Sequence, residues 1–514
     1  MKGDYALAID CGTQSLRAMA FDAKGTMVAK STYVYERAYF SLQKGWAEQD
    51  PMIWWNALCS SVGKVLENKE VASGIGSISI TAMRDTYVSL DKDMNIVRPS
   101  IVWLDQRRAR CSDGLGKDAF AMSLVGMSAT ALDAKKSTLA IWIQENEPGN
   151  WERTRHYISI PCFLGYKLTG KLADSDSNIC GHLPYDYRNA RWYKQSDMKW
   201  RLTPIELDKL PPIVPTGSVI GFVTGEGSAA TGLEEGLSVI AVGNDKACET
   251  IGSGCLDSSW ASVSFGTTAT IQLSIPKYVE PQTFMPCYRA VAPGLFNPEI
   301  QLYRGYWMVS WFSSQFGCND ALEASKLGIS VEQYMDRMLD QVDPGCDGLL
   351  MQPYWGPVLK KPECKGSFIG CASYHTKAHF YRSIIEGINF GLMEGCDVMS
   401  SRAKIKVTHL TSNGGGSKSP QVCQITADMF GLPVHCPQTN ETSGLGCAMT
   451  AFVSQGVFKD YQEASQAMVS FRSVYQPNMA NHKIYSDIYH KRYLGLYKRL
   501  RSIYRDMLKE TSNG

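Results

Sequence analysis

The feature that most constrains the fold of this chain is a strand–turn–strand pattern that occurs once in each half of the sequence. In the first copy, an apolar run at residues 5–9 ends in Asp10-Cys11-Gly12-Thr13-Gln14-Ser15, and a second apolar run follows at residues 16–21. In the second copy, the run at residues 260–265 ends in Gly266-Thr267-Thr268. A chain of 514 residues is too long for one ordinary core,. We therefore predict two domains and place them at residues 1–252 and 253–514.

The order of the expected elements indicates the fold class. A third strand is expected at residues 27–35, and further strands at residues 75–81 and 101–104,. Between them, Asp50-Pro51 opens a segment whose apolar residues recur every three or four positions, which predicts an amphipathic helix,. This order is typical of an α/β fold with a partly antiparallel sheet. Later in the chain we expect strands at 237–242 and 405–410, a helix at 380–399, and a C-terminal helix with a buried tyrosine stripe,.

The composition excludes several classes of partner. Lys and Arg number 52 and Asp and Glu number 50, so the net charge is only +2 and no basic excess favours nucleic acid or an anionic membrane,. The N-terminus lacks the pattern of a signal peptide, and no apolar run approaches the ~20 residues of a membrane span. The 16 cysteines form no CxxC pair, which suits reduced thiols,. We expect a cytoplasmic protein that binds neither nucleic acid nor membrane.

The two Gly-Thr turns are candidate phosphate sites. Glycine lets backbone amides approach an anion, and the neighbouring hydroxyl groups add hydrogen-bond donors. Each turn alone is also compatible with an ordinary hairpin. As a pair in different halves, they could hold a polyphosphate from two sides. The candidate residues are Gly12, Thr13, Gln14, Ser15, Gly266, Thr267 and Thr268.

Two aspartates at strand ends are candidates for catalysis. Asp10 precedes the first turn, where a carboxylate could hold Mg²⁺ through water; the alternative is an aspartate that starts the turn,. Asp245 follows the expected strand at 237–242 and precedes a helix. Phosphoryl transfer needs a base that accepts the proton of the attacking hydroxyl, and Asp245 fits this role. The alternative is an N-cap for the helix.

A glycine run later in the chain is a candidate nucleoside site. Gly414, Gly415 and Gly416 precede Ser419 and an expected helix, so a base or ribose could lie against the backbone there,. The segment is not a Walker A motif, because the GxxxxGK[ST] spacing is absent. The alternative is a flexible loop.

Charged and aromatic residues after two expected strands are candidates for binding hydroxyl groups. Arg84 and Asp85 follow residues 75–81, and Trp103 and Asp105 lie in or after residues 101–104. Charged side chains at strand ends could pair with vicinal hydroxyls. The alternative is a set of surface salt bridges.

These motifs, in this order, resemble those of the FGGY carbohydrate kinases over essentially the whole chain. The segment from Asp10 to Arg17 looks like the first phosphate motif of that family, and Gly266-Thr267-Thr268 looks like the second. Gly243-Asn244-Asp245 matches the position of the catalytic aspartate, and the segment from Gly414 to Pro420 resembles the adenosine motif. Two further segments are similar to ones shared by xylulokinases and glycerol kinases: Gly45 to Pro51, and Val102 to Arg108.

The resemblance implies two actin-like, ribonuclease H-like domains around a central cleft, the first binding sugar and the second ATP. It implies transfer of the γ-phosphate of ATP to a hydroxyl, with Asp245 as base and Asp10 orienting Mg²⁺. Phosphate contacts would come from Thr13, Gln14, Arg17 and Thr267. A homodimer is compatible with it. The expected substrate-binding residues are Arg84, Asp85, Trp103, Asp105, Asp245 and Lys246.

Departures from the better-known members concern the substrate. Met83-Arg84-Asp85 looks like the Arg-Glu pair of glycerol kinases with a shorter acid, and autoinducer-type kinases also carry Met-Arg-acid there. The tyrosine of glycerol kinases is absent, with Ala134-Lys135-Lys136 in its place, and Leu139 and Lys246 replace a lysine and a glutamine. We expect a pentulose such as xylulose, or a glycerol- or erythritol-like polyol. The alternative is a non-catalytic or sensor-type member of the actin-like ATPase superfamily.

Overall fold

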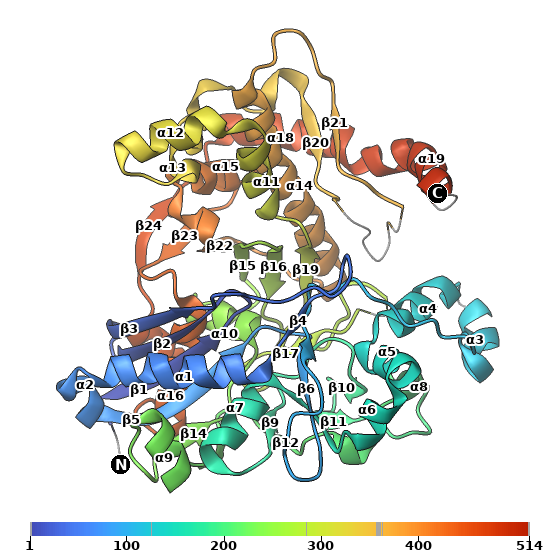
Figure 1. The fold of residues 1–514 in the computed structure, drawn as a ribbon. Coiled ribbons are helices and arrows are strands. Elements are labelled where there is room, and N and C mark those ends of the chain that lie inside the picture. The colour runs from blue at the N-terminus through green and yellow to red at the C-terminus, as the bar shows by residue number, and fades with distance from the viewer. Residues whose placement is uncertain (1–2, 125, 284, 356–360, 362, 512–514) are drawn as a thin grey trace. The chain divides into compact units, whose positions relative to one another are not determined.

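The computed structural model describes residues 3–124, 126–283, 285–355, 361 and 363–511. The chain forms two compact units, and both are discontinuous in sequence (Figure 1). The first comprises Met1–Leu256 together with Pro286–Asn297 and Glu441–Val469. The second comprises Asp257–Met285, Pro298–Asn440 and Ser470–Gly514. Two segments from the second half of the chain therefore complete the unit that the N-terminal half builds.

The first unit is built on a six-stranded sheet with the order β13-β14-β5-β1-β2-β3. The strands β1, β2 and β3 are antiparallel neighbours, whereas β5 and β14 run parallel to β1. The edge strand β13 is antiparallel to β14. The sheet is thus mixed, as expected. Its strands are β1 (Tyr5–Cys11), β2 (Ser15–Asp22), β3 (Met27–Val34), β5 (Ile75–Ala82), β13 (Val219–Phe222) and β14 (Ser238–Ile240).

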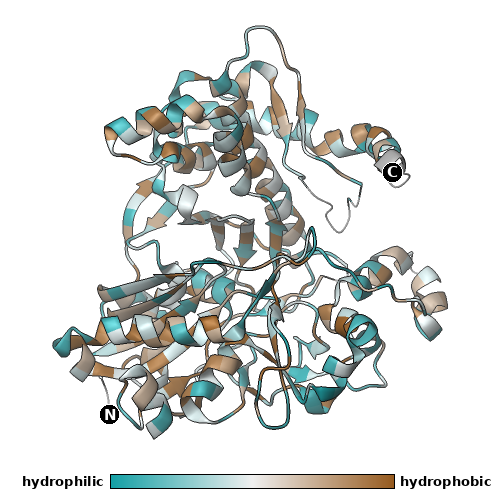
Figure 2. Cartoon of the chain, in the orientation of Figure 1, coloured by the Kyte–Doolittle hydropathy of each residue, from teal (hydrophilic) through white to brown (hydrophobic). Residues whose placement is uncertain are grey.

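Both faces of the central strand β1 are buried. Alternate residues of a strand point to opposite faces, so the residues of β1 enter two different cores. Leu7 and Ile9 belong to one core with helix α1 (Pro51–Leu66). Ala6 and Ala8 belong to a second core with helix α16 (Thr442–Ser454). Figure 1 shows α16, in the orange colours of the late chain, against the blue strands. In Figure 2 helix α1 carries hydrophobic and hydrophilic residues side by side, as an amphipathic helix on a sheet should,.

Helices α10 (Asp245–Gly252) and α16 meet through two glycines of the first unit. A Cβ atom added at Gly446 would lie 2.0 Å from the carbonyl oxygen of Cys248. A Cβ atom added at Gly252 would lie 2.0 Å from the carbonyl oxygen of Thr442. The two helix backbones therefore approach so closely that no side chain fits between them. This contact fixes α10, which begins at Asp245.

The second unit repeats the strand order of the first. Its sheet has the order β19-β16-β15-β22-β23-β24, with β15, β16 and β19 antiparallel and β22 and β23 parallel to β15. Helix α14 (Lys377–Ala403) packs on β16 and β19, and α15 (Pro420–Phe430) packs on β23. The strands are β15 (Trp260–Phe265), β16 (Ala269–Leu273), β19 (Glu299–Leu302), β22 (His409–Gly414), β23 (Val434–Pro437) and β24 (Phe471–Tyr475).

The matching strand orders confirm the internal repeat. The first Gly-Thr turn joins β1 to β2, and the second joins β15 to β16, so each lies between the first two strands of its sheet. The strand before each turn also pairs in parallel with another strand of its sheet: β1 pairs with β5, and β15 pairs with β22. The two turns hold equivalent positions in two sheets of the same topology.

Two strand predictions were wrong in their bounds. Of residues 101–104 only Ile101 is in a strand, β7 (Ser100–Ile101), because the Asp105 amide donates to the carbonyl of Val102 and closes a turn. Of residues 405–410 only the last two are in β22. Lys404 ends α14 in the left-handed conformation, and Ile405 still donates to Ser400 of that helix. In both places an apolar run continues past a backbone turn.

The C-terminal stripe is buried in part. Tyr485, Tyr489 and Tyr493 are buried in α18 (Met479–Ile488) and the adjoining π-helical turn, whereas Tyr497 on α19 (Leu494–Thr511) is half-buried. The ring of Phe390 stacks on Tyr489 and Tyr493, which ties this region to α14. No helix in the described part of the chain combines the length and apolar composition that crossing a bilayer requires.

Candidate active site

The carboxyl ends of three parallel strands place the predicted catalytic residues at one edge of the first sheet. Asp10 is the next-to-last residue of β1 and pairs in register with Thr81 of β5. The Thr81 hydroxyl donates to the carbonyl of Gly243, after β14, at 2.8 Å. Arg84 follows β5, and Asp245 follows Gly243. In open α/β sheets, ligands bind outside the carboxyl ends of the strands. This edge is therefore the candidate active site of the first unit.

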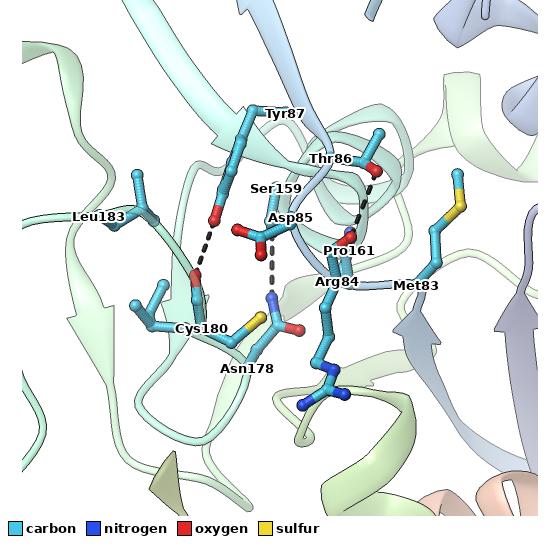
Figure 3. A pocket seen from close by; sticks show the side chains of 11 residues that line it. Met83, Arg84, Asp85, Thr86, Tyr87, Ser159, Pro161, Asn178, Cys180 and Leu183 are labelled. Carbon is cyan, nitrogen blue, oxygen red and sulfur yellow. Dashed lines mark hydrogen bonds between the residues drawn. The ribbon is translucent and has the colours of Figure 1, made fainter. Parts of the chain in front are cut away.

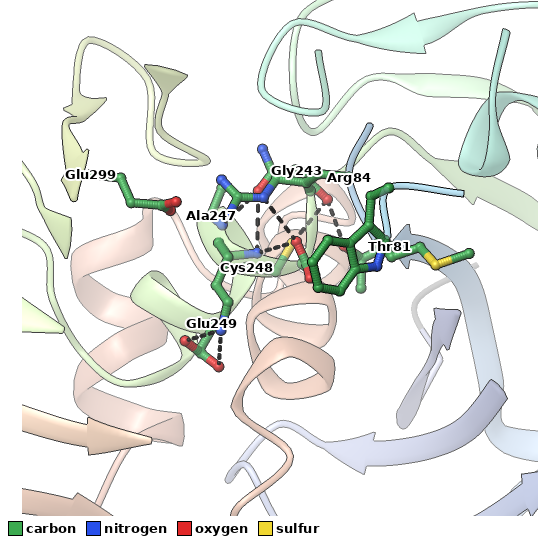
Figure 4. A network of polar contacts seen from close by, with 12 residues as sticks. Thr81, Arg84, Gly243, Ala247, Cys248, Glu249 and Glu299 are labelled. Carbon is green, nitrogen blue, oxygen red and sulfur yellow. Dashed lines mark hydrogen bonds and ion pairs between the residues drawn. The ribbon is translucent and has the colours of Figure 1, made fainter. Parts of the chain in front are cut away.

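Asp245 is the first residue of α10, and its neighbour caps the helix. The Asn244 side chain accepts hydrogen bonds from the amides of Lys246 and Ala247, so the alternative role of Asp245 as N-cap is wrong. The Asp245 carboxylate is 3.6 Å from Nε of Arg84, and its side chain keeps 29% exposure. Figure 4 shows Arg84, Gly243 and the start of α10 brought together.

The electrostatic setting of Asp245 suits a base that works near neutral pH. Burial raises the pKa of its carboxyl to about 6, although Arg84 and Lys246 oppose the shift. The Lys246 ammonium forms an ion pair with Glu249 at 3.0 Å, one turn along α10. A carboxylate with this pKa is ionised at pH 7 and binds a proton more strongly than an exposed aspartate does.

Asp10 lies within β1, so the alternative of a turn-starting aspartate is wrong. Its carboxylate forms an ion pair with Arg17 on the neighbouring strand at 2.7 Å, and Arg17 also pairs with Glu441 at 2.7 Å. Lys30 is a further partner of Glu441, at 2.5 Å. Burial raises the pKa of Asp10, with Arg17 opposing. Arg17, predicted to bind phosphate, thus lies between two carboxylates.

The carboxylates at this edge suit a magnesium ion that keeps most of its water. Mg²⁺ commonly takes one or two protein carboxylates and several waters. Asp10 lies near enough to Asp245 for its negative charge to raise the pKa of Asp245. A bound cation would relieve this repulsion between the two carboxylates. The described residues hold no group of three or more His, Cys, Asp or Glu that could bind a metal directly. A water-mediated ion at Asp10 stays a prediction.

The first Gly-Thr turn is closed by its own backbone and joined to Trp103. The Gly12 amide donates to the carbonyl of Ser15 at 3.0 Å, and the Tyr35 amide donates to the carbonyl of Gln14 at 3.0 Å. The indole N–H of Trp103 donates to the Thr13 hydroxyl at 2.9 Å. Trp103 and the first turn, predicted for sugar and phosphate respectively, are therefore direct neighbours.

Asp105 lies in a buried ion-pair network. Its side chain has 0% exposure, pairs with Arg107 at 2.7 Å and accepts from the Ala47 amide at 2.6 Å. Arg107 also pairs with Glu48 and lies 3.8 Å from the ring centroid of Trp46. The alternative of a surface salt bridge is therefore wrong for Asp105. Its predicted contact with substrate stays a prediction.

Arg84 and Asp85 point in different directions. Figure 3 shows the Asp85 carboxylate in a pocket below Tyr87, near Ser159 and Asn178, whereas the Arg84 guanidinium points away from it. Asp85 forms an ion pair with His182 at 3.5 Å and accepts from the His182 amide at 3.2 Å. Sequence reasoning missed His182, because it lies in a loop remote in sequence from Asp85 and no motif marks it.

The second Gly-Thr turn and the glycine run are neighbours in the second unit. β15 and β22 are parallel, and Phe265 pairs with Gly414, so Gly266-Thr267-Thr268 and Gly414-Gly415-Gly416 leave the same sheet edge. Gly414 has φ +77, and a Cβ atom at Gly416 would lie 2.7 Å from Phe265 and from the ring of Tyr306. The predicted adenosine and second phosphate motifs are thus adjacent.

The segment after the glycines is regular. Gly415–Lys418 forms a 3-10 turn, so the alternative of a flexible loop is wrong, and Ser419 caps α15 by accepting from the Val422 amide. An atom added at Gly415 would have no neighbour closer than 3.9 Å. Gly415 is therefore the open position of the three, while its two neighbours are packed.

Comparison with known proteins settles the family. The N-terminal domain of the FGGY family of carbohydrate kinases matches residues 5–252, and the C-terminal domain of that family matches residues 261–455. The chain belongs to the FGGY family of carbohydrate kinases. It is therefore a phosphotransferase with an alcohol group as acceptor, and ATP is the phosphate donor that this family implies.

Relatives of this FGGY kinase carry several substrate names. It is 27% identical to the xylulose kinase of Lactococcus lactis over 94% of this chain and 95% of that protein. Its fold matches the xylulose kinase of Lactobacillus acidophilus with a TM-score of 0.82, at 20% identity, covering 98% and 99% of the two chains. The gluconate kinase of the same organism matches with a TM-score of 0.81, at 20% identity and the same coverage. At this identity the solved structures confirm the two-domain actin-like fold and do not identify the sugar substrate.

Proposed function

We propose that this FGGY kinase transfers the γ-phosphate of ATP to a hydroxyl of a small neutral sugar or polyol, with Asp245 as the general base. The observation that carries the proposal is the setting of Asp245, at a strand end, beside Arg84 and with a pKa raised to about 6. Among substrates we favour a pentulose such as xylulose, because the xylulose kinase of Lactococcus lactis is similar over nearly its whole length. A glycerol- or erythritol-like polyol is the second candidate.

The residues of the first unit divide the reaction between them. The substrate hydroxyl lies against Asp245, which accepts its proton as the oxygen attacks the γ-phosphorus, and Arg84 holds the carboxylate in place,. Thr13, Gln14 and Arg17 contact phosphate oxygens, and the phosphate role of Thr267 in the second unit stays a prediction. Asp10 would hold Mg²⁺ through water, and the ion would supply positive charge against the phosphates. The glycines Gly414, Gly415 and Gly416, with Ser419, bind the nucleoside.

The compartment and the assembly are part of the proposal. We place the protein in the cytoplasm, which its cysteines support, because all of them are free thiols and most are buried,. A homodimer is the oligomeric state to test first.

An ADP-release assay over ketoses, polyols, aldoses and aldonic acids tests the function. We expect ATP turnover with at least one pentulose or short polyol, and no comparable turnover without sugar. Protein that is folded, binds ATP and releases no ADP with any member of the panel would instead favour the sensor-type alternative.

The rate should depend on pH through Asp245. The base must be ionised to accept a proton, so kcat/KM should fall about tenfold per pH unit below about pH 6 and level off above it,. The raised pKa moves this fall upward from that of an exposed aspartate, near pH 4. A pH–rate profile with saturating ATP measures it. A profile that is flat down to about pH 4.5 would remove Asp245 from the base role.

A further inference from the structure

We infer that His182 contacts the substrate and that, with Asp85, it binds one sugar hydroxyl other than the one that Asp245 deprotonates. The inference rests on the proposed function and extends it to a residue that no motif marks. It assigns part of the sugar specificity to the loop around residues 178–183, on the far side of Asp85 from Arg84.

The backbone at Asp85 is strained in a way that indicates function. Asp85 has φ +53, a left-handed conformation that an aspartate adopts at a cost,. Such strain persists where surrounding contacts enforce it, and it gathers at binding and catalytic sites. Here it turns the Asp85 carboxylate away from the Arg84 guanidinium and into the pocket.

The opposite loop is shaped to receive this carboxylate. Gly181 has φ +74, and a Cβ atom there would lie 1.5 Å from Oδ1 of Asp85. Only glycine leaves room for the carboxylate. The next residue then holds it twice, since the His182 amide donates to Oδ1 at 3.2 Å and Nδ1 of its ring lies 3.5 Å from the same oxygen.

The pair leaves one acceptor and one donor unused. Within the described residues, no hydrogen-bond partner is recorded for Oδ2 of Asp85 or for Nε2 of His182, and their side chains are 33% and 38% exposed. A hydroxyl group both donates and accepts, so it can satisfy the two atoms at once. An ammonium group or a carboxylate could satisfy only one of them. The pair therefore suits a neutral polyhydroxy substrate.

The charges around His182 favour the imidazolium form. Burial lowers the pKa of His182, but the Asp85 carboxylate outweighs it and the pKa is raised overall. Arg108 and Asp133, which pair with each other on the protein surface, act on the ring in opposite directions. Both ring nitrogens of an imidazolium carry hydrogens, so Nε2 is a donor whichever tautomer the neutral ring would adopt.

The site around the pair has the other parts of a sugar subsite. The Thr86 hydroxyl, next to Asp85, accepts from the backbone amide of Trp103, whose indole N–H donates to Thr13. Asn178 and Ser159, bonded to each other at 3.1 Å, line the pocket. Arg84, whose guanidinium points away from the Asp85 carboxylate in Figure 3, lies 3.6 Å from Asp245. Two polar pairs thus flank one short segment, and each would engage a different hydroxyl.

The test combines His182 variants with deoxy analogues of the best substrate found in the panel. For wild type, removal of one particular hydroxyl, not the phosphorylated one, should lower kcat/KM by about 10–100-fold, the size expected for a hydrogen bond to charged groups. His182→Ala should lower kcat/KM for the parent sugar by a similar factor and change it little for that analogue. The KM for ATP should stay the same. His182→Gln, which keeps a side-chain N–H, should recover part of the loss.

His156→Gln is the matched control, because His156 is a half-buried histidine of the first unit in strand β8 (His156–Ser159) that forms no part of the site. This variant should have the wild-type kcat/KM for every sugar. Equal losses for His182→Ala on the parent sugar and on all deoxy analogues would overturn the inference, as would no loss at all. If wild type turns over no sugar, the proposed function fails by itself. Calorimetric titration with the same sugars then decides the inference, which requires sugar binding by wild type that His182→Ala weakens.

Discussion

Replacing Asp245 by asparagine should lower kcat by about 10²–10⁴-fold, the usual contribution of a general base. Asparagine has nearly the same shape, but its amide cannot accept the proton of the attacking hydroxyl. The helix should be unaffected, because Asn244 and not Asp245 caps α10. The KM for ATP should change little. Steady-state kinetics with saturating sugar and ATP measure both constants.

Asp208→Asn is the control for this variant. Asp208 pairs with Arg155 on the surface of the same unit, and exposed pairs of this kind contribute little to stability,. It should keep the wild-type kcat. If Asp245→Asn retains more than about a tenth of wild-type turnover, another group accepts the proton and the role proposed for Asp245 is wrong.

Replacing Gly446 by alanine should destabilise the first unit by about 2 kcal/mol. The added methyl group would lie 2.0 Å from a backbone oxygen of α10, so the two helices must separate. Overpacking of this severity costs about 3 kcal/mol, whereas alanine returns about 1 kcal/mol of helix propensity. The clash therefore outweighs the propensity. Urea denaturation measures the effect, as a lower midpoint for unfolding of the first unit.

Gly63→Ala is the same substitution at a position where the propensity acts alone. Gly63 is exposed inside α1, and an added Cβ atom there meets nothing within 4 Å. This variant should be as stable as wild type or more stable, by up to about 1 kcal/mol. If both alanine variants shift stability in the same direction, the close helix contact is not what constrains residue 446.

The sequence predicted best the elements whose ends carry turn-forming or helix-capping residues. Asp22-Ala23-Lys24-Gly25 ends β2 and Gly25 has a positive φ, while Asp50 and Pro51 begin α1 as cap and first residue. These signals are local, and so are the turns they predict. The strand at residues 405–410 failed because its apolar pattern continued through the left-handed end of α14 at Lys404.

The candidate site was predictable only where a motif carried it. Asp245 and the Gly-Thr turns follow strands in recognisable contexts, and the fold places each at a strand end. The partners of these residues could not be predicted from motifs. Glu441 reaches Arg17 from the far end of the chain, and His182 reaches Asp85 from a separate loop. Such pairs depend on tertiary packing, which leaves no periodicity or spacing in the sequence.

The late segment that carries α16 has a consequence for how the protein is made. Ala6, Ala8, Met19 and Phe21 share a core with α16 and with α17 (Tyr461–Met468), yet a ribosome releases them long before residues 441–469 exist. Until then this face of the first sheet lacks the cover of α16 and α17, and exposed apolar faces promote association of nascent chains,. A fragment that stops at Leu256 would keep this open face permanently. An independently folding version of the first unit would need residues 441–469 grafted onto it, because the core shared with α16 closes only after these late residues have been made.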